Sequence, residues 1–283
     1  MKKSSLIWLL LSLLPLTGGA AEPSQSAAHP VAHIALIIDD IGDNLKLGTR
    51  AVRLPGAVTC SILPHTAYAR QLAAAAHRND KEVMLHLPME SEEEKAPGPG
   101  ALTLDMTQPE FLSTFESDLD AVPYAAGVNN HMGSLITRHP GHMRWLMQEI
   151  NRRGDLYFVD SRTTDLTVAQ QVARETGVPN LRRDVFLDDD QHASAIAAQF
   201  ARLIALAKHR GSAVAIGHPH PTTLRFLKEQ LPLLNDAGIQ LVSVSQLIKI
   251  KQQPKTLYAA NPLLMGAAKT DIAAARHAAV VTP

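Results

Sequence analysis

The chain has 283 residues, in which 27 lysines and arginines balance 27 aspartates and glutamates. A nucleic-acid partner, which would favour a basic face, is therefore not expected. A single cysteine, Cys60, excludes an internal disulfide, so the hydrophobic core must hold the fold together. The length is sufficient for one large α/β domain.

The first 21 residues have the pattern of a secretory signal peptide. A basic start at residues 1–3 precedes an apolar run over residues 6–16 and small residues at 18–21. The run is shorter than the ~20 residues that a membrane-spanning helix needs. We therefore expect residues 1–21 to be removed and the mature protein to be periplasmic, without stable membrane insertion; an uncleaved anchor is the alternative. Residues 22–32 are polar, contain proline and predict a linker.

Between residues 33 and 250, short apolar runs alternate with longer amphipathic stretches. Most runs are continuously apolar, as in parallel strands that are buried on both faces. We expect strands over residues 34–38, 58–63, 82–87, 125–128, 156–159, 185–187, 213–216 and 240–244. Local signals predict helices over residues 67–77 with Thr66 as cap, from Thr107 towards Leu119, over 143–153 with a stop at Gly154, and from Thr222 with a kink at Pro232. Residues 251–283 predict a poorly ordered tail.

Strand followed by helix, repeated along the chain, predicts a parallel sheet with helices outside it. A closed or nearly closed barrel and an open doubly wound sheet both fit this order of elements. No glycine-rich phosphate turn follows the first strand, which weakens the dinucleotide-binding form of the open sheet. We therefore expect residues 33–250 to form a single-domain α/β fold, a (β/α) barrel that is seven-stranded or irregular.

Reactive side chains follow several of the predicted strands, where such folds carry their active sites. They are Asp39, Asp40, His86, Glu90, Asn130, His131, Asp160, Ser161, Arg183, Asp184, His218 and His220. Carboxylates and imidazoles together suit zinc or a similar divalent metal, and a catalytic zinc commonly has three protein ligands. Asp40, His86 and His131 come from three separate strands and form such a set. The acidic run over residues 188–190, in contrast, predicts a solvated helix start.

Six segments carry these residues in chain order: LIIDD at residues 36–40, HLPME at 86–90, NNHMGS at 129–134, FVDSR at 158–162, RDVFLD at 183–188 and GHPH at 217–220. Together they resemble the polysaccharide deacetylases, and specifically their divergent branch of exported bacterial proteins. The resemblance covers residues 34–245, which is most of the expected mature chain.

The resemblance implies a role for each of the central residues. Asp39 would act as the base and Asp40 as a metal ligand, while His218, or alternatively His220, would be the general acid. Two histidines four residues apart normally complete the metal site in the broader superfamily, but Glu90 stands at the second of these positions. His131 then replaces the missing ligand, with Glu90 as the alternative. Substrate contacts or support of the ligands fall to the remaining residues: Glu90, Asn130, Asp160, Ser161, Arg183, Asp184 and His220.

The combined interpretation is a hydrolase that uses zinc, or another divalent metal, to remove acetyl groups from an N-acetylated polysaccharide of the cell envelope. Peptidoglycan is the candidate substrate that the expected compartment offers. The aromatic and arginine motifs of ordinary polysaccharide deacetylases are not evident in this sequence. The alternative is therefore an exported glycan-binding or envelope-regulating protein that keeps the fold but has lost deacetylation. The sequence identifies no protein partner.

Overall fold

The structure, a computed structural model, describes residues 31–93 and 95–253. The expected signal peptide, nearly all of the expected linker and nearly all of the expected tail lie outside these residues. The strands are β1 (Ala32–Ile41), β2 (Thr59–Ile62), β3 (Glu82–Met89), β4 (Ala125–Met132), β5 (Tyr157–Asp160), β6 (Asn180–Arg182), β7 (Val185–Phe186), β8 (Ser212–Gly217) and β9 (Ile239–Leu241). The helices are α1 (Leu45–Val52), α2 (Ala69–Arg78), α3 (Gln108–Ala121), α4 (Pro140–Arg153), α5 (Ala169–Glu175), α6 (Ala193–Arg210), α7 (Pro221–Gln230) and α8 (Val244–Gln252), with short 3₁₀ turns η1 (Ile136–Arg138) and η2 (Leu231–Leu233).

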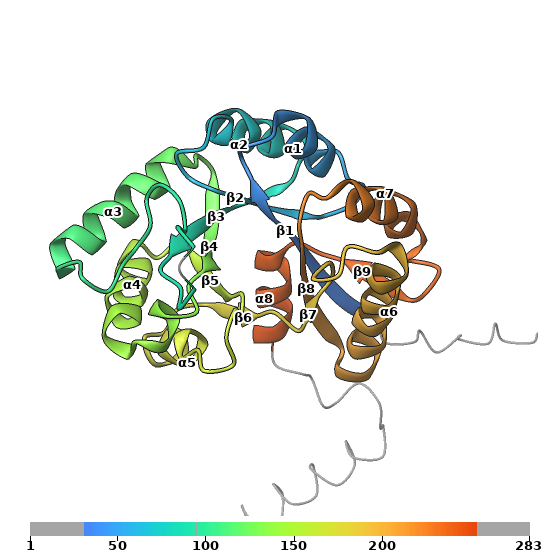
Figure 1. Cartoon of the computed structure of the whole chain (residues 1–283). Coiled ribbons are helices and arrows are strands. Elements are labelled where there is room, and N and C mark those ends of the chain that lie inside the picture. Colours follow the sequence, from blue (N-terminus) through green and yellow to red (C-terminus); the bar gives the residue numbers. More distant parts are fainter. Residues whose placement is uncertain (1–30, 94, 254–283) are drawn as a thin grey trace, which may run out of the picture. The chain divides into compact units, whose positions relative to one another are not determined.

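All strand pairs are parallel, and the sheet order is β6-β5-β4-β3-β2-β1-β8-β7, with β9 also paired to β1. The two ends of this order, β6 and β7, do not pair with each other, and we call the place between them the open seam. The sheet therefore curls into an incomplete barrel with helices outside it (Figure 1). The expected irregular (β/α) barrel is confirmed, although nine strands rather than seven take part.

Two apolar cores result from the alternation of side chains along the strands. In β1, Leu36 and Ile38 pack outward against the helices, whereas Ala35 and Ile37 belong to the core inside the curl. Continuous apolar strands are needed because both faces are buried. The prediction that continuously apolar runs form parallel strands is therefore confirmed.

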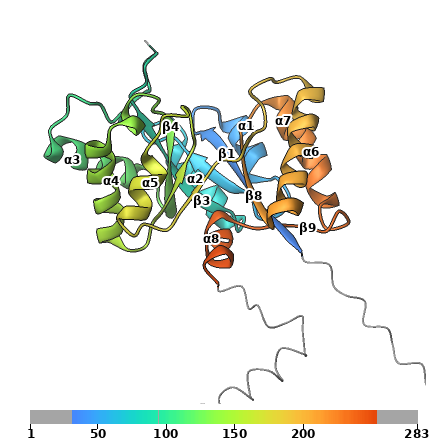
Figure 2. The same cartoon turned by 90° about the horizontal axis from the view of Figure 1, so that it is seen from below.

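Helix α8 covers the amino-terminal end of the curled sheet (Figures 1 and 2). Ser243 and Gln246 form a capping box that starts the helix at Val244. The carboxylate of Glu82 accepts the Ser245 backbone N–H at 3.2 Å, and an anion at a helix N-terminus is stabilised by the unpaired N–H groups there. The expected strand over residues 240–244 is therefore wrong in its second half, because β9 ends at Leu241.

Other local predictions have mixed outcomes. Gly154 ends α4 in a left-handed conformation, as expected. The kink expected at Pro232 is instead a helix end, because α7 (Pro221–Gln230) stops before Pro232 and the chain passes into η2. Thr66 is not a helix cap, since its hydroxyl donates to the Leu63 carbonyl and α2 begins at Ala69. Strand β6 was not predicted. Within the described part of the chain, no helix combines the length and the apolar character needed to cross a membrane.

Candidate metal centre

Along three strands, the inward-facing side chains change from apolar to polar towards the carboxyl end. The inner core contains Ile37 on β1, Met84 on β3 and Ile216 on β8. Side chains of a strand return to the same face every second residue. Two residues farther along the chain stand the polar groups Asp39, His86 and His218. The apolar lining of the curl thus gives way to acids and imidazoles at the carboxyl end of the sheet.

Asp40 departs from this alternation. Its φ of 53° lies in the left-handed region, which costs free energy for a residue with a side chain. The alternation would send Asp40 to the outer face of β1. The turn lets both neighbouring carboxylates reach the same cleft, which they line together with His86 and His131.

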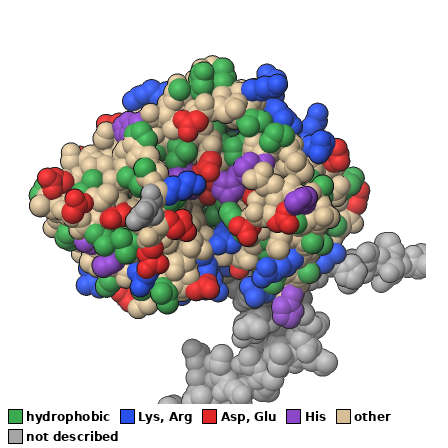
Figure 3. All heavy atoms as spheres, in the orientation of Figure 1, with side chains coloured by type: hydrophobic (Ala, Val, Ile, Leu, Met, Phe, Trp, Pro, Cys, Tyr) green, Lys and Arg blue, Asp and Glu red, His purple; other side chains and the backbone are tan. Residues whose placement is uncertain are grey.

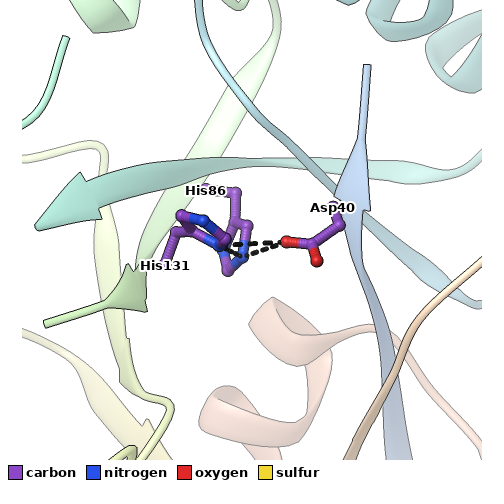
Figure 4. Close-up of side chains that lie close together, drawn as sticks. All are labelled: Asp40, His86 and His131. Atoms are coloured by element: carbon purple, nitrogen blue, oxygen red, sulfur yellow. Dashed lines mark hydrogen bonds and ion pairs between the residues drawn. The ribbon is translucent and has the colours of Figure 1, made fainter. Parts of the chain in front are cut away.

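Asp40, His86 and His131 present one atom each to a common point (Figure 4). Asp40 Oδ1 lies 3.1 Å from His86 Nε2 and 3.0 Å from His131 Nδ1, and the two ring nitrogens are 3.1 Å apart. Three ligands at ~2.0–2.2 Å from one ion, spread at angles of about 90–109°, stand roughly 2.8–3.6 Å apart. The Asp40 Oδ1 atom is also buried and, apart from its approach to these two ring nitrogens, has no hydrogen-bond partner among the described residues. The triangle therefore fits a divalent metal in both size and donor type.

Asn129 connects the triangle to Asp39. Its Nδ2 donates to both carboxylate oxygens of Asp39, at 2.9 and 3.1 Å. Its Oδ1 consequently faces the Ser61 hydroxyl at 2.7 Å and His86 Nδ1 at 2.8 Å. Because an amide oxygen only accepts, neutral His86, the form that binds a metal, carries its proton on Nδ1, and its Nε2 lone pair then faces Asp40 and His131. Asn129 is not among the residues predicted for the site, although it lies two residues before His131 on the same strand face.

The charges in this centre stabilise a cation. Burial opposes ionisation of Asp40, but His131 and His86 outweigh burial and hold the pKa of Asp40 well below its usual range. Burial likewise lowers the pKa of His86, yet the carboxylates of Asp39 and Asp40 raise it above its ordinary value overall. Two carboxylates around one buried and one half-buried imidazole thus favour positive charge at this point, which a divalent ion would supply.

His218 stands on the other side of Asp40, and Asp188 fixes it. His218 Nδ1 lies 2.9 Å from Asp188 Oδ1, while Asp188 Oδ2 accepts the His218 backbone N–H at 2.7 Å and the Thr223 hydroxyl at 2.8 Å. His218 Nε2 is left 3.9 Å from Asp40 Oδ2. Burial lowers the pKa of His218, but Asp188, Asp39 and Asp40 raise it to about 9 overall.

The reading of residues 188–190 as a solvated helix start is wrong for Asp188. Only 3 % of this residue is exposed, and α6 begins later, at Ala193. Asp188 comes directly after the apolar β7 region, and that position places it at the carboxyl end of the sheet. Asp188, His218 and His220 also offer ligand atoms within 4.8 Å of one another. Both Asp188 oxygens already accept hydrogen bonds, however, so these contacts orient His218.

The two alternative residues lie away from the triangle. Glu90 Oε2 accepts the backbone N–H of Leu104 at 2.7 Å and thereby holds the loop after β3. His220 precedes α7, and its ring centroid is 5.8 Å from that of His218. Neither residue lines the main cleft. The geometry therefore favours His131 over Glu90 as the third ligand and His218 over His220 as the acid.

Three further predicted residues surround the ends of β4 and β5. Asn130 donates to the Met132 carbonyl at 2.8 Å and accepts the Ser161 backbone N–H at 2.9 Å, so it joins these two strand ends. Asp160 accepts from Arg162 N–H and the Thr167 hydroxyl, and it forms no hydrogen bond or ion pair with a histidine among the described residues. The Ser161 hydroxyl is buried, lacks a hydrogen-bond partner in the described structure and belongs to a residue that lines the cleft.

Arg183 and Asp184 are adjacent in the chain but have separate partners in the described structure. Arg183 donates to the carbonyl oxygens of Ser161 and Arg162, whereas Asp184 accepts from Arg210 at 3.3 Å. Both residues nevertheless line the cleft, which has a volume of about 820 Å³. Figure 3 shows this face hollowed near its centre, with acidic, histidine and basic side chains around the hollow.

The sequence of this domain matches a model of the divergent polysaccharide deacetylases over residues 36–248. The chain belongs to the divergent polysaccharide deacetylase family. It is 39% identical over 219 residues to the uncharacterized protein YibQ of Escherichia coli K12, covering 77% of this chain and 68% of that protein. The family resemblance expected from the six sequence segments is thus confirmed.

Solved structures share the fold of this family member. An uncharacterized protein, ATU2773 from Agrobacterium tumefaciens C58, superposes with a TM-score of 0.74 at 21% identity, covering 80% of this chain and 92% of that one. A BA3943 mutant described as a CE4 family pseudoenzyme superposes with a TM-score of 0.50 at 14% identity, over 78% and 68% of the two chains. At these identities the likeness establishes the fold alone.

Proposed function

We propose that this protein is a zinc-dependent hydrolase that removes acetyl groups from an N-acetylated polysaccharide. The observation that carries the proposal is the triangle of Asp40, His86 and His131, with Asp39 and His218 beside it. A metal-ligand set, a buried carboxylate and an oriented imidazole are the groups that metal-assisted amide hydrolysis needs.

A divalent ion held by the triangle would polarise the acetyl carbonyl and lower the pKa of a bound water. Asp39 is positioned to take the proton of the attacking water, because Asn129 orients both of its oxygens. His218 is positioned to give a proton to the departing amine, because Asp188 holds its Nδ1 and leaves Nε2 facing the centre. The raised pKa of His218, about 9, keeps that proton in place at neutral pH.

The compartment and the substrate belong to the same proposal. The pattern of residues 1–21 supports export to the periplasm, where peptidoglycan is an N-acetylated amino-sugar polymer. Mass spectrometry of protein recovered from the periplasm tests export, since cleavage near residue 21 is expected. Intact residues 1–21 on the recovered protein would contradict that part of the proposal.

Acetate release from N-acetylated glycan oligomers by the zinc-loaded protein tests the activity. Asp39→Asn is expected to abolish release while keeping one equivalent of zinc, since Asp39 is a base in this scheme and not a ligand. Asp43→Asn, an exposed neighbour outside the cleft, is the matched control and keeps both properties. A zinc-replete wild-type protein that releases no acetate from any such oligomer would contradict the proposed activity.

The second candidate is a glycan-binding or envelope-regulating protein of the same fold without deacetylation. Two observations favour this candidate. The carboxylate of Glu90 turns to Leu104 instead of joining the triangle, and the cleft has few aromatic lining residues. Among the described residues that line the cleft, Phe186 is the only phenylalanine, tyrosine or tryptophan. Saturable glycan binding by a metal-replete protein that releases no acetate would favour this candidate.

A further inference from the structure

The cleft beside the metal centre is charged unevenly. Its lining arginines all come from one side, where β5 and β6 end and α6 passes: Arg162, Arg182, Arg183, Arg202 and Arg210. We call these five residues the arginine rim. The opposite side contributes Ser91, Glu93 and Ser134 to the lining, and its described lining residues include no lysine or arginine.

Local acids neutralise only part of the arginine rim. Arg162 pairs with Asp165 at 2.7 Å, and Arg210 pairs with Asp184 at 3.3 Å. Arg182 and Arg202 are exposed and have no carboxylate within ion-pair distance in the described structure. Apart from Asp39 and Asp40 at the metal centre, the acids on this side of the lining are Asp165, Asp184 and Asp189. Five arginines therefore face three aspartates, which leaves two positive charges in excess.

Arg183 is held in place by partners that carry no negative charge. Its Nε donates to the Ser161 carbonyl at 2.6 Å and its Nη2 to the Arg162 carbonyl at 2.7 Å. The guanidinium also lies over the Phe186 ring, 4.9 Å from its centroid. Burial and then the nearby charge of Arg162 lower the pKa of Arg183, and the carboxylates of Asp39, Asp160 and Asp189 offset this only in part. An anion reaching this rim would meet a cation that is already ordered.

We propose that the arginine rim binds a carboxylate on the substrate, so that an acidic amino-sugar polymer is selected over a neutral one. The inference rests on the proposed deacetylase function, since it names the class of glycan that reaches the same centre. Guanidinium groups present paired N–H donors that match the two oxygens of a carboxylate. Arg183 is pre-ordered, and Arg182 and Arg202 at the open seam and on α6 supply attraction from solvent. The buried Ser161 hydroxyl, which has no described partner, offers one further donor.

Isothermal titration of the zinc-loaded full chain with oligomers of equal length tests the inference. One oligomer is neutral N-acetylglucosamine, a second carries lactyl-ether carboxylates on alternate sugars, a third carries uronic acids, and a fourth has the lactyl carboxylates converted to amides. We expect at least one acidic oligomer to bind about tenfold more tightly than the neutral and amidated ones at low salt. The acidic oligomer with the lower Kd identifies the source of the carboxylate. Equal or undetectable binding of acidic and neutral oligomers would overturn the inference.

A pair of double variants assigns the preference to the rim. Arg182→Ala/Arg202→Ala removes the two unpaired rim charges. Arg78→Ala/Arg225→Ala removes two exposed arginines that do not line the cleft and so matches the change in net charge. The ratio of neutral to acidic Kd should fall towards one in the rim variant and stay near ten in the control. Thermal unfolding of both variants verifies the fold, and an unchanged ratio in a folded rim variant would refute the assignment.

Acetate release measured on the same oligomers separates this inference from the proposed activity. Release from neutral and acidic oligomers alike, with equal Kd values, would leave the deacetylase proposal standing and overturn carboxylate recognition. A rim-dependent acidic preference without release from any oligomer would support carboxylate recognition and contradict the deacetylase proposal.

Discussion

Replacement of Asn129 by alanine should weaken both the fold and the metal centre. The substitution removes one hydrogen bond to the Ser61 hydroxyl, one to His86 and two to the Asp39 carboxylate. Neutral hydrogen bonds contribute about 1 kcal/mol each and those to charged groups about 1.5–3 kcal/mol. Because the two bonds to Asp39 share one amide, we count them as about 2 kcal/mol together. The free energy of unfolding should therefore fall by roughly 4 kcal/mol.

The effect on the metal separates this role from simple stabilisation. Loss of the partner that orients a ligating histidine commonly costs about 10–100-fold in metal affinity. The matched control is Asn130→Ala, which deletes the same side chain one residue later. Asn130 bonds Met132 and Ser161 and not the triangle, so this variant should lose stability but keep its zinc affinity. Urea unfolding of the metal-free proteins and zinc titration against a chromophoric chelator provide the two readouts. Equal zinc affinities for the two variants would refute the reasoning.

Three other substitutions test separate contacts. Asp188→Asn removes the largest of the contributions that raise the pKa of His218, so the alkaline limit of any acetate release should move to lower pH; an unchanged pH–rate profile would count against the role given to the contact between Asp188 and His218. Burial raises the pKa of Asp118 from 3.8 to about 8, so this carboxyl stabilises the fold below pH 4 and the contribution is lost as pH rises to 8. Between pH 5 and pH 8, the free energy of unfolding measured in urea should fall less for Asp118→Asn than for the wild type. Equal falls for the two proteins would contradict this prediction. Gly100→Ala should lower stability by about 1–3 kcal/mol in the same assay, because Gly100 has a φ of 77° and an added Cβ would collide with Asp118; a wild-type unfolding midpoint would contradict this.

The sequence predicts the barrel because its strands carry an unambiguous signal. Continuous apolar runs such as residues 34–38 are required on strands that are buried on both faces, and the polar residue after each run marks the carboxyl end. The order of strands and polar residues along the chain is therefore enough to group Asp40, His86 and His131. Strand β6 was missed because it has three residues, and only one of them, Leu181, is buried.

The contacts that support the centre depend on register, which the sequence does not display. Asn129 is placed beside His86 by the pairing of β3 with β4, and an asparagine is not a residue type that indicates a metal ligand. Asp188 was hidden in an acidic run that is typical of a solvated helix start. The left-handed turn at Asp40, which brings both carboxylates into one cleft, follows from tertiary packing. No glycine stands at this position to indicate a left-handed residue in the sequence.

Zinc stoichiometry in two single variants tests the central claim most directly. The sequence left His131 and Glu90 as alternatives for the third ligand, and the structure places only His131 within 3.1 Å of the other ligand atoms. Wild-type protein and Glu90→Ala should each retain one equivalent of zinc after dialysis, with two imidazole ligands by X-ray absorption. His131→Ala should lose the zinc under the same conditions. Zinc retained by His131→Ala but lost by Glu90→Ala would contradict the account.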